Sequence, residues 1–145
     1  MTEAPLYQKI LVGVDGSDSS KHALEQALRL AALINAKVHV LSVEEHRAAF
    51  AGTVGEVDEE HRYEEKYFRQ VHADVRRRAE AHGVNATHEI VTGHAADALV
   101  RLATRGGYDL IVLGHTGHSR LRHFPFGSTA DRVTEHATCP VLIVR

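Results

Sequence analysis

Short apolar runs alternate with amphipathic stretches along the whole chain. "KILVGVD" (residues 9–15), "YDLIVLG" (108–114) and "CPVLIVR" (139–145) are rich in β-branched residues, and turn-forming residues follow the first two runs. Continuous apolar runs of this length are typical of strands that are buried on both faces, as in parallel sheets. Together with two weaker runs, the pattern predicts five strands, at residues 9–15, 37–43, 86–91, 108–114 and 139–145.

Between these runs, apolar residues recur with helical spacing. Helices are expected at residues 19–35, 59–82 and 128–137, and between Gly93 and Gly106. In the second helix Tyr67, Val71, Val75 and Ala79 mark the apolar stripe, and Gly83 is placed to end the helix.

Strict alternation of strands and helices predicts a doubly wound parallel sheet with helices on both faces. We expect residues 1–145 to form one domain, since the length fits one and no repeat or linker divides it. The most hydrophobic runs, 9–15 and 108–114, should be central, and the mixed run 86–91 should lie at an edge. Residues 44–58 are predicted to be an insertion after the second strand; of a lid and a plain surface loop, the loop is favoured.

The composition narrows the class of protein. A net charge of −2 gives no overall attraction to nucleic acid or to anionic membranes, so a basic site must be local. The longest apolar runs are far too short to span a membrane, and a single cysteine, Cys139, excludes an internal disulfide framework. We therefore expect a cytoplasmic protein in a reducing compartment. Cys139 is interpreted as a packed residue rather than a nucleophile.

A ligand site is expected where the two central strands end. Doubly wound sheets bind ligands beyond the carboxyl ends of their strands, at the point where the strand order reverses. The fourth strand leads there into "GHTGHSRLRHFPFGST" (114–129), which holds three glycines, three histidines and two arginines but no acid. Glycines let backbone N–H groups approach an anion, and a helix that starts near Ser128 would add its positive end. The stretch is therefore predicted to hold phosphate; helix capping alone would explain Ser128 but not three spaced glycines.

The same stretch matches a family signature. Gly114, Gly117, Gly127 and Ser128 occupy the fixed positions of G-x2-G-x9-G-[ST], the signature of the universal stress protein family. The similarity covers essentially the whole chain, including "KILVGVDGSDSSKHALEQAL" and "FGSTADRVTEHATCPVLIVR". The chain thus resembles the ATP-binding members of this family. The resemblance implies a five-stranded sheet in the order 3-2-1-4-5, an adenine nucleotide alpha hydrolase-like three-layer sandwich, that binds ATP or AMP.

The resemblance also implies roles for particular residues. Asp15 matches the acid that contacts the adenosine part of the nucleotide, Gly13 and Val14 precede it at the same pocket edge, and Val43 matches the residue whose backbone meets the adenine. The residues that match the segments around the ribose and the phosphates are Leu113, Gly114, Thr116, Gly117, Gly127, Ser128 and Thr129. Mg²⁺ or Mn²⁺ would be carried by the phosphates rather than by the protein.

Asp15 has a second interpretation, as a helix N-cap or turn residue. Ser17 and Asp18 can cap the first helix equally well, which leaves Asp15 available for a ligand. His115 and His118 could contact phosphate or metal; phosphate contact or simple exposure is favoured.

No residue is assigned a catalytic or protein-metal role. The motifs HExxH, CxxC and GxSxG are absent, and Asp15 is expected at the adenosine end, so no convincing base for hydrolysis is identified. The run "RRR" at 76–78 is interpreted as a solvated helix face rather than a nucleic-acid site.

The final strand bears on assembly. Val141–Val144 is a continuous apolar run that should lie at a sheet edge, where it needs cover. Pairing with the same strand of a second subunit would cover it, in agreement with the homodimer that the resemblance implies; burial under the chain's own helices is the alternative.

Three functions remain open at this point. The preferred one is an ATP-binding regulatory protein of the stress response, with a regulatory protein partner of unknown identity. The second is a slow ATPase with at most weak hydrolysis. The third is an interaction module that binds AMP, cyclic AMP or no nucleotide.

Overall fold

The computed structural model describes residue 3 and residues 5–45, 54–116 and 128–145. Its elements follow one another as β1 (Lys9–Gly13), α1 (Asp18–Ile34), β2 (Lys37–Glu44), α2 (Val54–His82), β3 (Ala86–Thr92), α3 (Ala95–Gly106), β4 (Leu110–Gly114), α4 (Ser128–His136) and β5 (Val141–Val144). All strand pairs are parallel and the order is β3-β2-β1-β4-β5, so the predicted doubly wound fold is confirmed.

The central strands owe their position to their composition. β1 pairs with β2 on one side and with β4 on the other, and Ile10, Leu11 and Val12 are each 0% exposed. A strand with helices over both faces has no solvated side, which is why its sequence does not alternate between polar and apolar residues. The prediction that β1 and β4 are central and that β3 is an edge strand is correct.

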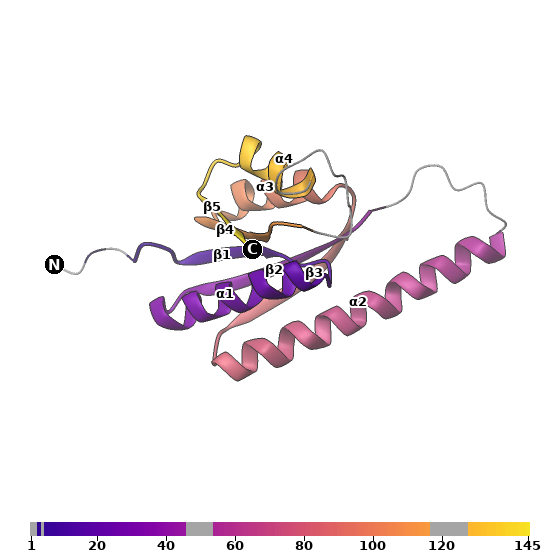
Figure 1. Cartoon of the computed structure of the whole chain (residues 1–145), viewed down its shortest axis with the longest axis horizontal. Helices are drawn as coiled ribbons and strands as arrows, with labels where there is room; N and C mark the ends of the chain where they lie inside the picture. Colours follow the sequence, from indigo (N-terminus) through magenta and orange to yellow (C-terminus); the bar gives the residue numbers. More distant parts are fainter. Residues whose placement is uncertain (1–2, 4, 46–53, 117–127) are drawn as a thin grey trace.

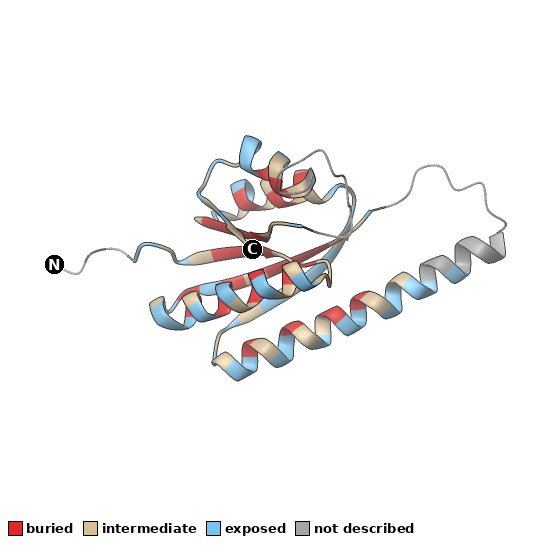
Figure 2. Ribbon diagram, viewed as in Figure 1, coloured by how far each residue is buried: buried red, intermediate tan, exposed pale blue. Residues whose placement is uncertain are grey.

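Helices cover the sheet in two layers (Figure 1). One core lies between the sheet and the helices α1 and α2, and it includes Val38, Leu24 and Val75. The other lies between the sheet and α3 and α4, and it includes Leu99 and Val133. Figure 2 shows the buried residues on the strands and on the sheet-facing sides of these helices.

Helix α1 begins and ends with residues that satisfy its free backbone groups. Ser17 is the N-cap, and its side chain accepts a hydrogen bond from the Ser20 amide at 3.2 Å. Asn35 ends the helix in the left-handed conformation, where its amide donates to the Ala31 carbonyl. The start of the helix is thereby fixed beside the end of β1.

Helix α2 is longer than the sequence pattern predicted. It starts at Val54 rather than at residue 59, so most of the expected insertion is divided between the end of β2, the start of α2 and the undescribed residues 46–53. The sequence before residue 59 shows no clear helical periodicity, so the pattern did not reveal this extension. In Figure 1 the first turns of α2 project beyond the sheet.

The buried stripe of α2 differs by one residue from the prediction. Phe68, Val71, Val75 and Ala79 are buried, whereas Tyr67 is half-buried. Gly83 follows the helix with a φ of 64°, as predicted for a C-terminal glycine.

The remaining boundaries shift by at most two residues, as is usual at the ends of elements. The buried face of α3 consists of Ala96, Leu99 and Ala103. Among the described residues, no helix is long and apolar enough to cross a membrane.

Candidate nucleotide site

The carboxyl ends of β1 and β4 lie next to each other in the middle of the sheet. β4 continues the parallel pairing with β1 through Ile10–Leu110, Leu11–Ile111 and Val12–Val112. The strand order turns back here, because β2 and β3 lie on one side of β1 while β4 and β5 lie on the other. The turns that follow β1 and β4, the two segments singled out from the sequence, therefore begin side by side.

The backbone of Val14 and Asp15 is held at all four of its polar groups. The Val14 amide donates to the Leu41 carbonyl at 3.0 Å, and the Val14 carbonyl accepts from the Ser42 hydroxyl at 2.6 Å. The Asp15 amide donates to the Ser20 hydroxyl at 3.3 Å, and the Asp15 carbonyl accepts from the Tyr67 hydroxyl. The direction of the Asp15 side chain is thus set by β2, α1 and α2 together.

The Asp15 carboxylate also has a local partner. Its Oδ1 accepts a hydrogen bond from the Ser17 amide at 2.9 Å, so Asp15 does act as a turn residue. Ser17, and not Asp15, caps α1. The interpretation of Asp15 as a turn residue is therefore confirmed. Its contact with a ligand stays a prediction, which the Ser17 contact leaves open because a carboxylate can accept several hydrogen bonds.

Gly114 lies directly against the first turn of α1. A Cβ atom added at Gly114 would come within 2.6 Å of the Ser19 carbonyl carbon and 2.7 Å of its oxygen, and within clashing distance of its hydroxyl. The Thr116 amide donates to that hydroxyl at 3.2 Å. The absence of a side chain at Gly114 lets the glycine-rich stretch start in contact with α1.

His115 forms hydrogen bonds with neighbouring residues of the same chain. Its amide donates to the Val144 carbonyl at 2.9 Å, and its Nδ1 lies 3.3 Å both from that carbonyl oxygen and from the Ser19 hydroxyl. His115 thus joins β5 to α1 at the end of β4. His118, which was considered with it, lies outside the described residues.

The other predicted residues are placed as follows. Leu113 is buried at the end of β4, and a Cβ atom at Gly13 would come within 2.7 Å of its side chain. Val43 is half-buried and packs into the core beneath α3 and α4. Ser128 is the first residue of α4, as expected, and Thr129 is half-buried in that helix. Gly117 and Gly127 lie outside the described residues.

Four residues that hydrogen-bond to the backbone of the candidate site were not identified from the sequence, namely Ser19, Ser20, Ser42 and Tyr67. They reach Val14, Asp15 and Thr116 from three different elements. In the run "DGSDSS" the residues interpreted as caps are Ser17 and Asp18 rather than Ser19 or Ser20, and nothing in the pattern around Ser42 or Tyr67 points to β1.

Two side chains near this region have shifted acidity. The pKa of the Tyr67 hydroxyl is raised by burial first and then by the charges of Asp15 and Tyr63, so the hydroxyl stays protonated as a donor. The pKa of His88 is lowered to about 4, chiefly by burial, with His72 and His39 adding to the effect and Glu89 opposing it. His88 is therefore neutral at pH 7.

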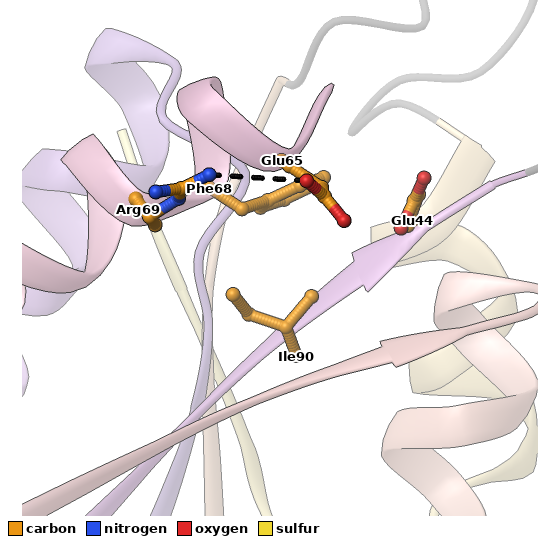
Figure 3. Close-up of a pocket in the computed structure, with 5 residues that line it drawn as sticks. All are labelled: Glu44, Glu65, Phe68, Arg69 and Ile90. Atoms are coloured by element: carbon orange, nitrogen blue, oxygen red, sulfur yellow. Dashed lines mark ion pairs between the residues drawn. The ribbon is translucent and has the colours of Figure 1, made fainter. Parts of the chain in front are cut away.

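A separate groove of about 390 Å³ lies between α2 and the ends of β2 and β3. Figure 3 shows Glu65, Phe68 and Arg69 on α2, with Ile90 of β3 and Glu44 of β2 opposite them. Glu44 follows Val43 directly, but neighbouring strand residues point to opposite faces of a sheet, so the groove is on the α2 side. None of the predicted nucleotide residues that the structure describes lines it.

The model of the universal stress protein family matches residues 6–145. The chain belongs to the universal stress protein family. A universal stress protein of Methanocaldococcus jannaschii is 34% identical over 142 residues, which cover 97% of this chain and 83% of that protein. The family assignment made from the glycine signature is therefore confirmed.

Solved structures of the family share the fold. A universal stress protein from Lactobacillus plantarum superposes with a TM-score of 0.76 at 30% identity, covering 96% of this chain and 98% of that one. A universal stress protein crystallised in complex with cAMP superposes with a TM-score of 0.73 at 31% identity, covering 96% of this chain and 97% of that one.

Proposed function

We propose that this chain is an adenine-nucleotide-binding regulatory protein of the stress response, with ATP as its ligand. The observation that carries the proposal is the junction of β1 and β4, where the fixed Asp15 and the side-chain-free Gly114 lie at the switch point of the sheet. The intact G-x2-G-x9-G-[ST] signature supports ATP, and the relative solved with cAMP supports an adenine nucleotide.

The residues present fit such a ligand in chemical character. A carboxylate can accept hydrogen bonds from ribose hydroxyls, and we assign this role to Asp15, with Gly13, Val14 and Val43 around the adenosine. The phosphates would lie along the glycine-rich stretch, at Leu113, Gly114, Thr116 and Gly117, and against Gly127, Ser128 and Thr129. A helix N-terminus favours negative charge, and α4 begins at Ser128. Mg²⁺ or Mn²⁺ would reach the site on the phosphates.

Binding rather than turnover is the proposed activity. Phosphoryl transfer needs a group that positions the attacking water and groups that stabilise the phosphoryl charge. Asp15, the carboxylate of this site, is assigned to the adenosine end, so we expect ATP hydrolysis to be weak at most. ADP production by protein of controlled purity measures this directly, and turnover that disappears in Ser128→Ala would overturn the assignment as a binding protein.

We further propose a cytoplasmic homodimer that pairs through β5. The Leu142 side chain is 41% exposed on this edge strand, and the known pairing of β5 is with β4 on one side. An exposed apolar edge strand favours pairing with another strand. Light scattering of the native protein should give the mass of two chains, and Leu142→Lys should shift the equilibrium towards the monomer.

The first experiment is mass spectrometry of the nucleotide released from freshly purified protein, followed by calorimetric titration with ATP, AMP and cAMP. Asp15→Asn should weaken ATP binding at least about tenfold, as for loss of a charged hydrogen-bond acceptor. Asp18→Asn is the matched control, because Asp18 is an exposed acid three residues away on α1. Equal affinity of both variants and the native protein would contradict the proposed site, and the absence of binding by any adenine nucleotide would favour an interaction module.

A further inference from the structure

A chain of hydrogen bonds runs from α2 through two strands to the end of β1. His72 Nδ1 of α2 lies 2.8 Å from His88 Nδ1 of β3, and His88 Nε2 lies 2.9 Å from the Ser42 hydroxyl of β2. That hydroxyl lies 2.6 Å from the Val14 carbonyl oxygen, and Ser42 is 0% exposed. The planes of the His72 and His88 imidazole rings are inclined by only 22° and their centroids are 4.9 Å apart, as for rings that meet edge to edge through this hydrogen bond.

The donor and the acceptor of each hydrogen bond in this series follow from the Val14 carbonyl at its end. A carbonyl only accepts, so the Ser42 hydroxyl donates to Val14 and must accept from His88. His88 therefore carries its proton on Nε2, which leaves Nδ1 as the acceptor for a proton on His72 Nδ1. The pKa of His88 near 4 agrees with this neutral form. The groups that act on His88 are His72 from α2, His39 from β2, and Glu89 from its own strand.

The series of hydrogen bonds ends at Val14, the residue before Asp15. The carbonyl of Val14 and the amide of Asp15 belong to one planar peptide group, so fixing the carbonyl also fixes the amide that donates to Ser20. Tyr67 of α2 holds the next carbonyl, that of Asp15. Helix α2 thus reaches the Asp15 backbone by two routes.

We propose that Ser42, His88 and His72 are positioning residues of the nucleotide site, which set the direction of Asp15 and make nucleotide affinity depend on the hydrogen bond between His72 of α2 and His88 of β3. This inference rests on the proposed function, because it assigns Asp15 to the nucleotide. None of the three residues needs to touch the ligand. They act through the Val14–Asp15 peptide, and so a change as remote as His72 should alter affinity.

The test is a double-mutant cycle read by calorimetric titration with ATP. Ser42→Ala should raise the Kd about fivefold, as for the loss of one neutral hydrogen bond. His72→Phe keeps a flat aromatic ring beside His88 but removes the donor, and it should raise the Kd about twofold. If the chain acts as a unit, the double variant should be no weaker than Ser42→Ala alone. Ser42→Thr, which keeps the hydroxyl, should restore most of the native affinity.

Val75→Ala is the matched control for general destabilisation. Val75 lies one turn after His72 on the same helix and is 2% exposed, but its side chain has no polar group. This variant should lose stability and keep native ATP affinity. Nitrogen-15 NMR of His88 should also report the Nε2–H tautomer in the native protein and a changed signal in Ser42→Ala.

The outcomes separate the inference from the function. If the native protein binds ATP and Ser42→Ala binds it equally well, the positioning chain is refuted while the nucleotide site stands. Additive losses in the double variant, or an equal loss in Val75→Ala, would also refute the chain. If the native protein binds no adenine nucleotide, the proposed function fails and the inference fails with it.

Discussion

Gly114→Ala tests the contact between the glycine-rich stretch and α1. The backbone of Gly114 does not adopt a positive φ, so alanine would introduce no conformational strain of its own. The difficulty is space, because the new Cβ atom would lie 2.6 Å and 2.7 Å from the carbonyl carbon and oxygen of Ser19. These are main-chain atoms in the first turn of α1, and they cannot turn aside as a flexible side chain would.

The variant should therefore be less stable than the native protein. Forcing an extra methyl group into a closely packed site costs about 2 kcal/mol, which lowers the Tm of a chain of this size by roughly 4–8 °C. Separation of β4 from α1 would also weaken the 3.2 Å hydrogen bond from the Thr116 amide to Ser19. We therefore expect ATP affinity to fall together with stability.

Thermal unfolding and calorimetric titration with ATP measure the two effects. Gly83→Ala is the matched control, because Gly83 has a φ of 64° but nothing within 4 Å of an added Cβ atom. It should cost about 1–2 kcal/mol through backbone strain at the end of α2 and leave ATP affinity unchanged. A Gly114→Ala protein that unfolds within 1 °C of the native one and binds ATP normally would refute the reasoning about this contact.

Further predictions concern acid stability, Tyr67 and the third signature glycine. His88 has a folded pKa near 4 and an ordinary value of 6.5, so the unfolded chain binds the proton more readily and stability should fall as the pH drops from 6.5 to 4. The full pKa shift corresponds to about 3 kcal/mol of stability, and solvent screening of this partly buried group reduces it to about 1–2 kcal/mol. Urea unfolding at pH 7 and pH 4.5 should show a smaller fall in the free energy of unfolding for His88→Gln than for the native protein. Tyr67→Phe should lose about 1 kcal/mol in the same assay, because the Asp15 carbonyl loses its donor; unchanged stability would show that this hydrogen bond contributes nothing. Gly127→Val should abolish ATP binding while its circular dichroism stays native, and normal binding would refute the phosphate role of the signature.

Much of the architecture could be derived from local patterns. The uninterrupted apolar runs of β1 and β4 identify strands without a solvated face, and such strands must be central when helices cover both sides. The capping residue Ser17 and the glycine Gly83 mark helix ends because their chemistry suits only a few backbone positions. The start of α2 was misplaced because the residues before 59 show no clear helical periodicity.

The spacing Gly114, Gly117, Gly127 and Ser128 can be read without a structure, because a contiguous signature needs no folding to be recognised. The surroundings of Asp15 could not be read in that way. Ser42 and Tyr67 are 28 and 52 positions away from the residues they hold, and His72 meets His88 across 16 positions. Such pairs depend on the register of parallel strands and on the docking of α2, and neither leaves a local trace. The sequence alone thus determined the family, the order of elements and the glycines that could receive phosphate. Only the tertiary structure decided which distant side chains hold the backbone at the end of β1, because long-range hydrogen bonds form only once the sheet has assembled.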